Sequence, residues 1–203
     1  MTTSFWDSQE IGKQFRECST LKEIIARLET DFSLKGEVIC EIRVNGILLS
    51  EDDEVKFAAH PRETIQEISI ASNRPGDLIS QALESADIFI PELDKACLRT
   101  AEKLRGADLP AAQASFRETI EGCQWFVDTL MHVRGAASGI EKPISNPALW
   151  FEAEKMITQV IREVSEAYGN EDYVLVADLL EYELTGTLAV WKNVLDSERP
   201  LRT

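Results

Sequence analysis

The spacing of apolar residues changes character once along the chain. Up to about Asn73, short apolar runs switch between strand-like and helical spacing. From Pro75 to about Ser197, apolar residues recur every three or four positions, and no strand-like run appears in the sequence. This order predicts an α+β protein in two parts: a small mixed α/β domain at residues 1–73 and an antiparallel four-helix bundle at residues 74–203.

The first part contains a clear helix followed by a hairpin. Residues 19–23, STLKE, fit a helix cap, and apolar positions then mark one face of a helix that should stop near Gly36. A β-branched run at 38–44 is followed by Asn45-Gly46, a tight hairpin turn because both residues tolerate positive φ. The remaining predicted elements are a short strand at 47–49, a short helix at 51–57 and a closing strand at 64–71.

This order resembles the ubiquitin-like β-grasp family over about residues 1–76. STLKEI corresponds to the start of the main helix, EIRVNGILL to the central strand and turn, and ETIQEISIASNRPG to the closing strand. The family places a hairpin before the main helix, and residues 3–6 and 11–16 would form it. The resemblance implies a fused docking module; a conjugatable modifier is not expected, because the chain continues past Gly76. An unrelated small α+β subdomain is the alternative.

The second part is predicted to contain four amphipathic helices. Pro91 should kink or divide the first of them, and a glycine-containing stretch at 135–146 should be a flexible connection. Short turns near residues 106–108 and 169–170 indicate two antiparallel pairs that close one bundle. The predicted helices cover residues 75–104, 110–134, 147–168 and 171–195.

The helical part weakly resembles the flagellin-specific export chaperones of bacteria, which are four-helix bundles. The similarity rests on AEKLRGAD at 101–108, QWFV at 124–127, EAYGNED at 166–172 and LAVWK at 188–192. It implies a bundle that holds an amphipathic segment of an export substrate. The α/β part before it is foreign to those chaperones.

Charge and composition narrow the classes of partner. The 203 residues carry 36 acidic and 21 basic side chains, a formal charge of −15, so neither nucleic acid nor an anionic membrane surface is an expected partner. No stretch is apolar and long enough to predict a membrane span, and the first residues do not resemble a signal peptide. Cys18, Cys40, Cys97 and Cys123 lack metal-ligand spacing and are predicted to be buried free thiols. We therefore expect a cytoplasmic protein.

The sequence offers little recognisable catalytic chemistry. Neither His60 nor His132 has an acidic residue three positions earlier, as a metal-carboxylate bundle requires, and no glycine-rich phosphate loop is present. The carboxylates Asp178, Glu181 and Glu183 are predicted to form a solvated helix face. We expect no metal, nucleotide or other cofactor and no enzymatic activity. An enzyme with a thiol or carboxylate site that the sequence does not reveal is the alternative.

Five aromatic residues of the helical part are the candidate partner-binding residues: Trp125, Trp150, Phe151, Tyr182 and Trp191. Tryptophan and tyrosine at an exposed edge are common interface anchors, whereas the alternative is that these rings fill the core. At about 100° per residue, Trp125 lies about 200° from Cys123 and so outside the centre of its helix's apolar stripe.

These features favour a non-catalytic intracellular interaction protein of adaptor or scaffold type. It would bind another protein, or itself as a homodimer, through an edge strand or an apolar groove between helices. A secretion or flagellar-type export chaperone is the second reading, and an enzyme is the third.

Overall fold

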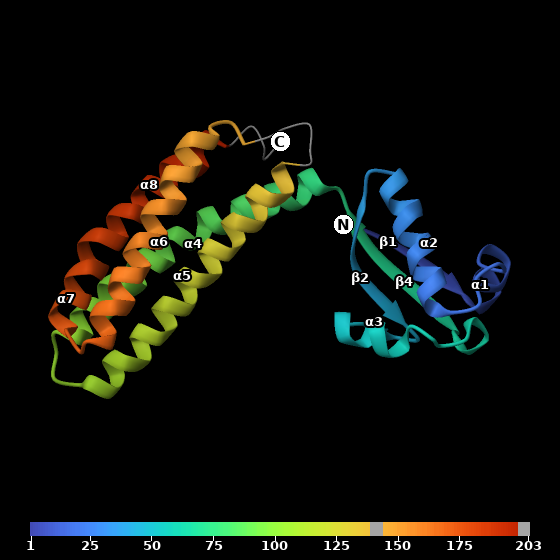
Figure 1. The fold of residues 1–203 in the computed structure, drawn as a ribbon, viewed down its shortest axis with the longest axis horizontal. Helices are drawn as coiled ribbons and strands as arrows, with labels where there is room; N and C mark the ends of the chain where they lie inside the picture. The colour runs from blue at the N-terminus through green and yellow to red at the C-terminus, as the bar shows by residue number, and fades with distance from the viewer. Residues whose placement is uncertain (139–143, 199–203) are drawn as a thin grey trace. The chain divides into compact units, whose positions relative to one another are not determined.

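The chain forms an α+β structure with two compact units. The computed structural model describes residues 1–138 and 144–198 and divides the chain into Met1–Leu78 and Ile79–Thr203 (Figure 1). The boundary expected after Asn73 lies a few residues before this division, which falls within the first turn of helix α4 (Pro75–Leu104). That each part folds independently stays a prediction.

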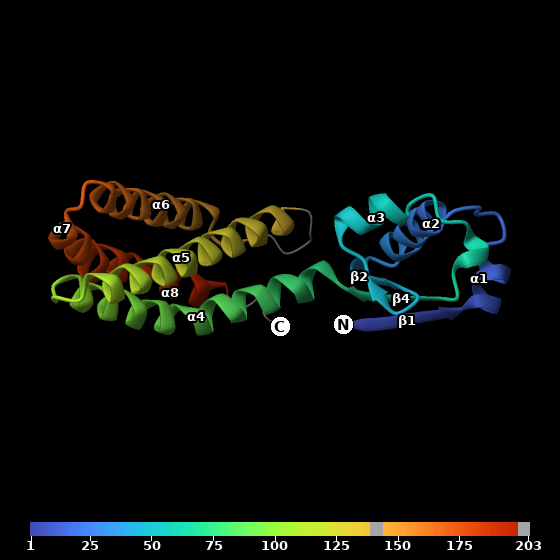
Figure 2. The same cartoon turned by 90° about the horizontal axis from the view of Figure 1, so that it is seen from below.

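A four-stranded antiparallel sheet forms the centre of the first unit. Its strands lie in the order β1 (Thr2–Asp7), β4 (Glu67–Asn73), β2 (Val38–Val44) and β3 (Ile47–Leu48). Helix α2 (Leu21–Leu34) packs across one face of this sheet (Figure 2). Its apolar stripe meets the isoleucines of β2 and β4 and forms a core separate from that of the helices. The shorter elements are α1 (Ser8–Gln14), α3 (Glu51–Phe57) and a 3-10 turn η1 (Arg62–Thr64).

The prediction of a hairpin before the main helix is wrong. Strand β1 is present, but residues 8–14 form helix α1, and β1 pairs antiparallel with β4 instead. The reason is a capping box: the Asp7 carboxylate accepts from the Glu10 N–H at 2.9 Å, and Glu10 accepts from the Asp7 N–H at 3.1 Å. The chain therefore departs from the β-grasp order at its first connection.

The predictions for the tight turn and the two helix starts in this unit are confirmed. The turn at Asn45-Gly46 has positive φ at both residues, 51° and 80°, as the hairpin requires. Thr20 caps α2 through the Glu23 N–H, and the Ser50 hydroxyl accepts from the Asp53 N–H at the start of α3. The closing strand is shifted, because η1 occupies residues 62–64 and β4 begins only at Glu67.

The second unit consists of long helices around one apolar core. Helix α4 is followed by α5 (Leu109–Ala137) and α6 (Pro147–Gly169). The last helical stretch comprises α7 (Tyr173–Asp178), a π-helical segment η2 (Leu179–Leu184) and α8 (Thr185–Ser197). Among the described residues, no helix combines the length and apolarity needed to cross a membrane.

At Pro91 a kink or a division was predicted, and the structure shows that helix α4 is not divided there, since packing of its long apolar face outweighs the loss of one backbone hydrogen bond. One boundary in the helical unit differs from expectation. Helix α5 continues through Ala137, so the connection expected from residue 135 begins later, and its residues 139–143 lie outside the described part of the chain. The cap predicted at Asn146-Pro147 is confirmed: Asn146 accepts from the Leu149 N–H at 3.1 Å.

Separate cores lead to a prediction about fragments. A fragment beginning at Arg74 should remain helical and unfold cooperatively, because the apolar residues of α4 to α8 pack against one another. Far-ultraviolet circular dichroism during urea unfolding measures this. An unfolded fragment would mean that the helices depend on the first unit for stability.

Three of the four cysteines are buried as expected, and Cys40 is not. Cys18, Cys97 and Cys123 are buried free thiols, whereas Cys40 is exposed on β2. The pairing of β2 with β4 shifts register between Ile39 and Glu41, which leaves Cys40 as an extra residue of a bulge. In the helical unit, a hydrogen bond with Cys123, together with burial, raises the pKa of the Cys97 thiol far above its ordinary value. The Cys97 thiol is therefore held in the unreactive protonated form.

This difference in burial predicts the reactivity of the thiols. In the folded protein a disulfide reagent should modify one thiol rapidly, that of Cys40, and the other three only on unfolding. Cys40→Ser should remove the rapid phase, and Cys18→Ser should leave it unchanged. A rapid phase of more than one thiol would show that the cores open readily.

A candidate interaction groove on the helical unit

The structure does not bring the five candidate aromatic residues together. Trp150 and Trp191 are fully buried, so they offer a partner no surface, and for these two the core alternative is correct. Their rings meet edge to face with centroids 5.1 Å apart, and Phe126 lies 5.9 Å from Trp191 in the same manner. Trp150 occupies the core stripe of α6 because it lies three, seven and ten residues before Ala153, Ile157 and Val160.

The other three candidates are exposed on different parts of the unit. Phe151 is 58% exposed on α6, Tyr182 is 64% exposed on η2 and Trp125 is 45% exposed on α5. The Trp125 ring packs against Phe89 of α4 at 4.7 Å between centroids. Of the three, only Phe151 lines the groove described next.

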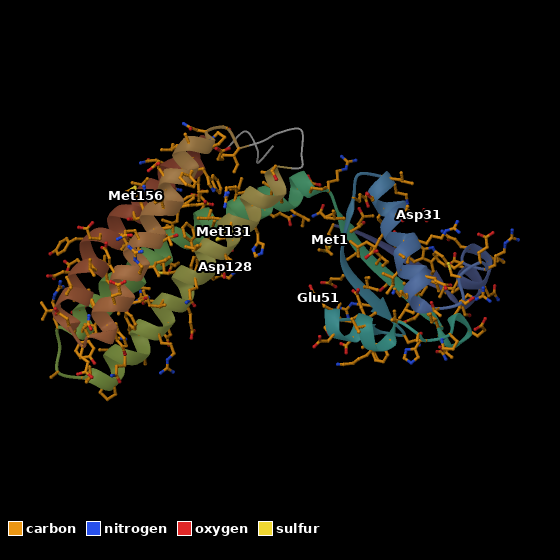
Figure 3. All side chains as sticks on the ribbon, in the orientation of Figure 1. Met1, Asp31, Glu51, Asp128, Met131 and Met156 are labelled. Carbon is orange, nitrogen blue, oxygen red and sulfur yellow. The ribbon has the colours of Figure 1, made fainter. Side chains whose placement is uncertain are left out.

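A groove of about 500 Å³ runs between α5 and α6. Val127 and Met131 of α5 and Phe151 of α6 give it an apolar surface, and Met131 is 50% exposed. Figure 3 labels Met131 on α5. The remaining lining residues are polar or charged: Arg134, Glu154, Lys155, Thr158, Gln159 and Arg162. Exposed methionine and phenylalanine beside positive charge are features of a binding groove.

The charges of the groove are unequally paired. Glu154 accepts at the same oxygen, Oε1, from Arg134 Nε and Trp150 Nε1, both at 2.9 Å, and its side chain is only 13% exposed. Arg162 donates to Gln159 and lies 3.8 Å from Glu166, whereas Lys155 has no ion pair among the described residues. The described lining thus holds three cations and one largely buried anion, on a chain whose formal charge is −15.

Helix periodicity explains why sequence reasoning missed this groove. Val127, Met131 and Arg134 follow the spacing i, i+4, i+7, so they share a face of α5 next to its buried stripe. Lys155 and Arg162, seven residues apart, likewise share a face of α6. The sequence shows the spacing that defines each of these faces. It does not show that tertiary packing places the two faces beside each other.

Trp125 lies outside the groove, and we predict how its replacement changes stability and association. Replacing it with alanine removes its contact with Phe89, which should lower the free energy of unfolding by about 1 kcal/mol. We expect a larger loss, about 2 kcal/mol, in association with a partner, because a half-exposed indole is a typical interface anchor. Melting temperature and binding affinity of Trp125→Ala, with Trp125→Phe as the matched control, measure both effects. Lower melting temperature with unchanged association would limit Trp125 to packing.

A second pocket, of about 310 Å³, lies within the first unit beside β3. Its lining is mainly apolar and includes Val44, Ile47, Leu49 and Phe57. The imidazole of His60 at its edge stacks on Phe57 with ring centroids 4.9 Å apart. No other ionisable side chain is among its described lining residues. The pocket offers apolar contact rather than acid–base chemistry.

The ionisable residues singled out from the sequence are engaged elsewhere. Asp178 accepts from Arg105 Nη2 at 2.7 Å, and Glu181 accepts from Arg105 Nη1. These bonds, with that to Asp178 first, raise the pKa of the Arg105 guanidinium. Glu183 is exposed, and so are both histidines. Within residues 1–138 and 144–198, His, Cys, Asp and Glu side chains form no cluster of three or more suited to a metal ion.

Comparison with known proteins identifies a family but no characterised relative. No curated protein and no solved structure matches the chain significantly. One family model matches residues 81–194, which is more than half of the 203 residues. The match includes the whole α5/α6 groove and excludes the pocket of the first unit. The chain therefore belongs to the family described as a domain of unknown function (DUF8042).

Proposed function

We propose that this protein is a non-catalytic interaction protein of adaptor or scaffold type, which binds a segment of another protein in the α5/α6 groove. The observation that carries this proposal is the exposed pair Met131 and Phe151 on facing helices, beside cationic side chains. Covering a large apolar side chain stabilises a complex by about 1.5–3 kcal/mol. Two such side chains are enough to anchor a hot spot.

The proposal assigns different roles to the two units. The helical unit, taken as an antiparallel four-helix bundle with residues 173–197 as its last helix, would hold the partner. The first unit would be a second docking module, using the apolar pocket beside β3 or the free edge of the sheet. The β-grasp similarity supports such a role only in general terms, since the first hairpin is replaced by α1. We propose a cytoplasmic location, in keeping with the free thiols.

An export chaperone is a narrower form of the same function. A groove open to an amphipathic segment suits a chaperone of secretion or flagellar type, and the choice between the two depends on whether the partner is exported. An enzyme is less well supported, because Cys97 and Cys123 are buried and the carboxylates Asp178 and Glu181 are paired with Arg105.

Quantitative affinity capture from cells that make the protein tests the proposal. The bait carrying Met131→Asp and Phe151→Asp should lose a defined set of proteins that the wild-type chain retains. Val174→Asp is the matched control, because Val174 is 66% exposed on α7 and outside the groove. An identical set of captured proteins for all three baits would contradict the proposed use of the groove.

A further inference from the structure

We infer that the occupant of the α5/α6 groove is an amphipathic helix of another protein, whose apolar stripe is flanked by aspartate and glutamate. This inference rests on the proposed function and adds the shape and the charge of the partner segment. Three features of the groove carry it: its walls, its length and its charge.

The walls of the groove favour a helix over an extended segment. Both walls are helices, whose backbone N–H and C=O groups are already paired along their length, so an added strand would find no edge to bond with. A helix satisfies its own backbone and needs only a matching apolar stripe. A third helix can lie in the furrow between two others at the usual distance of about 8–10 Å between axes.

The length of the groove sets the length of the bound helix. On α6 the lining extends from Phe151 to Arg162, eleven residue steps, which corresponds to about 16 Å at about 1.5 Å per residue. On α5 it extends from Val127 to Arg134. The groove therefore accommodates about three helical turns, with Met131 and Phe151 available to an apolar stripe.

The charge of the groove determines which residues are favoured beside the apolar stripe of the bound helix. Arg134, Lys155 and Arg162 surround the apolar surface, and the single anion of the lining, Glu154, is already bonded to Arg134 and Trp150. Lys155 is exposed and has no ion pair among the described residues, so an incoming carboxylate meets a cation that is not yet neutralised. On a chain of charge −15 this cationic patch favours an acidic helix and disfavours a basic one.

Three labelled peptides of about 14 residues, long enough for three to four turns, test the inference on the full chain. They share one leucine stripe and carry acidic, basic or uncharged polar flanks. Fluorescence anisotropy should give an affinity for the acidic peptide at least about tenfold higher than for the basic one at low salt, with a smaller ratio at high salt. Phe151→Asp should abolish binding of the acidic peptide.

Charge reversal within the groove provides the sharpest control. Lys155→Glu combined with Arg162→Glu should reverse the preference toward the basic peptide, while Lys155→Arg combined with Arg162→Lys should keep it. Arg117→Glu is matched in charge and lies on α5 outside the groove, so it should leave the preference unchanged.

Several outcomes would overturn the inference. Equal affinity for the three peptides would contradict the inference that the partner helix has acidic flanks. If none of the three peptides bound, the inference that the groove binds a helix would be contradicted. Self-association of the wild-type chain that is lost in Phe151→Asp would make a second copy the occupant. In each case affinity capture still decides the proposed function separately, because it depends on the groove residues and not on the chemistry of the peptide.

Discussion

Replacing Trp191 with alanine is expected to lower the free energy of unfolding by about 4 kcal/mol. Trp191 is fully buried and meets both Trp150 and Phe126 edge to face, so alanine leaves a large cavity that rigid helices cannot fill. Urea unfolding followed by far-ultraviolet circular dichroism measures the loss. This is the largest destabilisation that we expect from a single substitution.

Trp191→Phe is the matched control for this prediction. The indole Nε1 has no hydrogen-bond partner among the described residues, so phenylalanine retains much of the ring and removes an unpaired donor. Its cost should stay below about 1.5 kcal/mol. A loss of less than about 1 kcal/mol for Trp191→Ala would contradict the placement of this ring in the core.

Glu198 is expected to be the most sensitive charged residue. Its buried carboxylate follows α8 and accepts from the Ser145 N–H at 2.9 Å, the Ser145 hydroxyl at 2.9 Å and the Asn146 N–H at 3.4 Å. These groups lie immediately before α6, where negative charge is favoured by the helix dipole. Glu198→Ala leaves buried donors unpaired and should lower the free energy of unfolding by about 3 kcal/mol.

Two variants separate the role of Glu198 from a general effect of charge. Glu198→Gln retains the size and part of the hydrogen bonding, so its cost should be about half that of alanine. Glu183→Ala removes an exposed carboxylate of the same helical stretch and should change stability by less than about 0.5 kcal/mol. Urea unfolding measures these costs. If Glu198→Ala lowered the free energy of unfolding no more than Glu183→Ala does, the Glu198 carboxylate would not hold α6 and α8 together.

Local chemistry made part of the fold predictable from sequence. Asn45-Gly46 indicates its hairpin because few other pairs accept positive φ at both positions, and Asn146-Pro147 indicates the start of α6 through its cap. The capping pattern of Asp7 and Glu10 was equally present in the sequence. The hairpin prediction for residues 11–16 came from the β-grasp resemblance and not from alternating apolar residues, so a segment that is helical up to Gln14 was predicted as a strand.

Tertiary packing determines which aromatic residues are buried and which helices lie side by side, and local sequence patterns do not specify either. Trp150 and Phe151 are neighbours in sequence, yet one is fully buried and the other 58% exposed, because the orientation of α6 toward the core selects between them. No single-residue preference distinguishes the π-helical residues of η2 from an α-helix. The groove required α5 and α6 to be placed side by side, which the spacing within either helix does not specify.

Photo-crosslinking in cells tests the central claim most directly. A photoreactive phenylalanine analogue at Met131, inside the groove, should yield discrete crosslinked proteins, and these products should disappear when Phe151 is replaced by aspartate. The same analogue at Arg117, exposed on α5 outside the groove, should not yield them. Identical products from both positions, or no product from Met131, would contradict a partner-binding role for the α5/α6 groove.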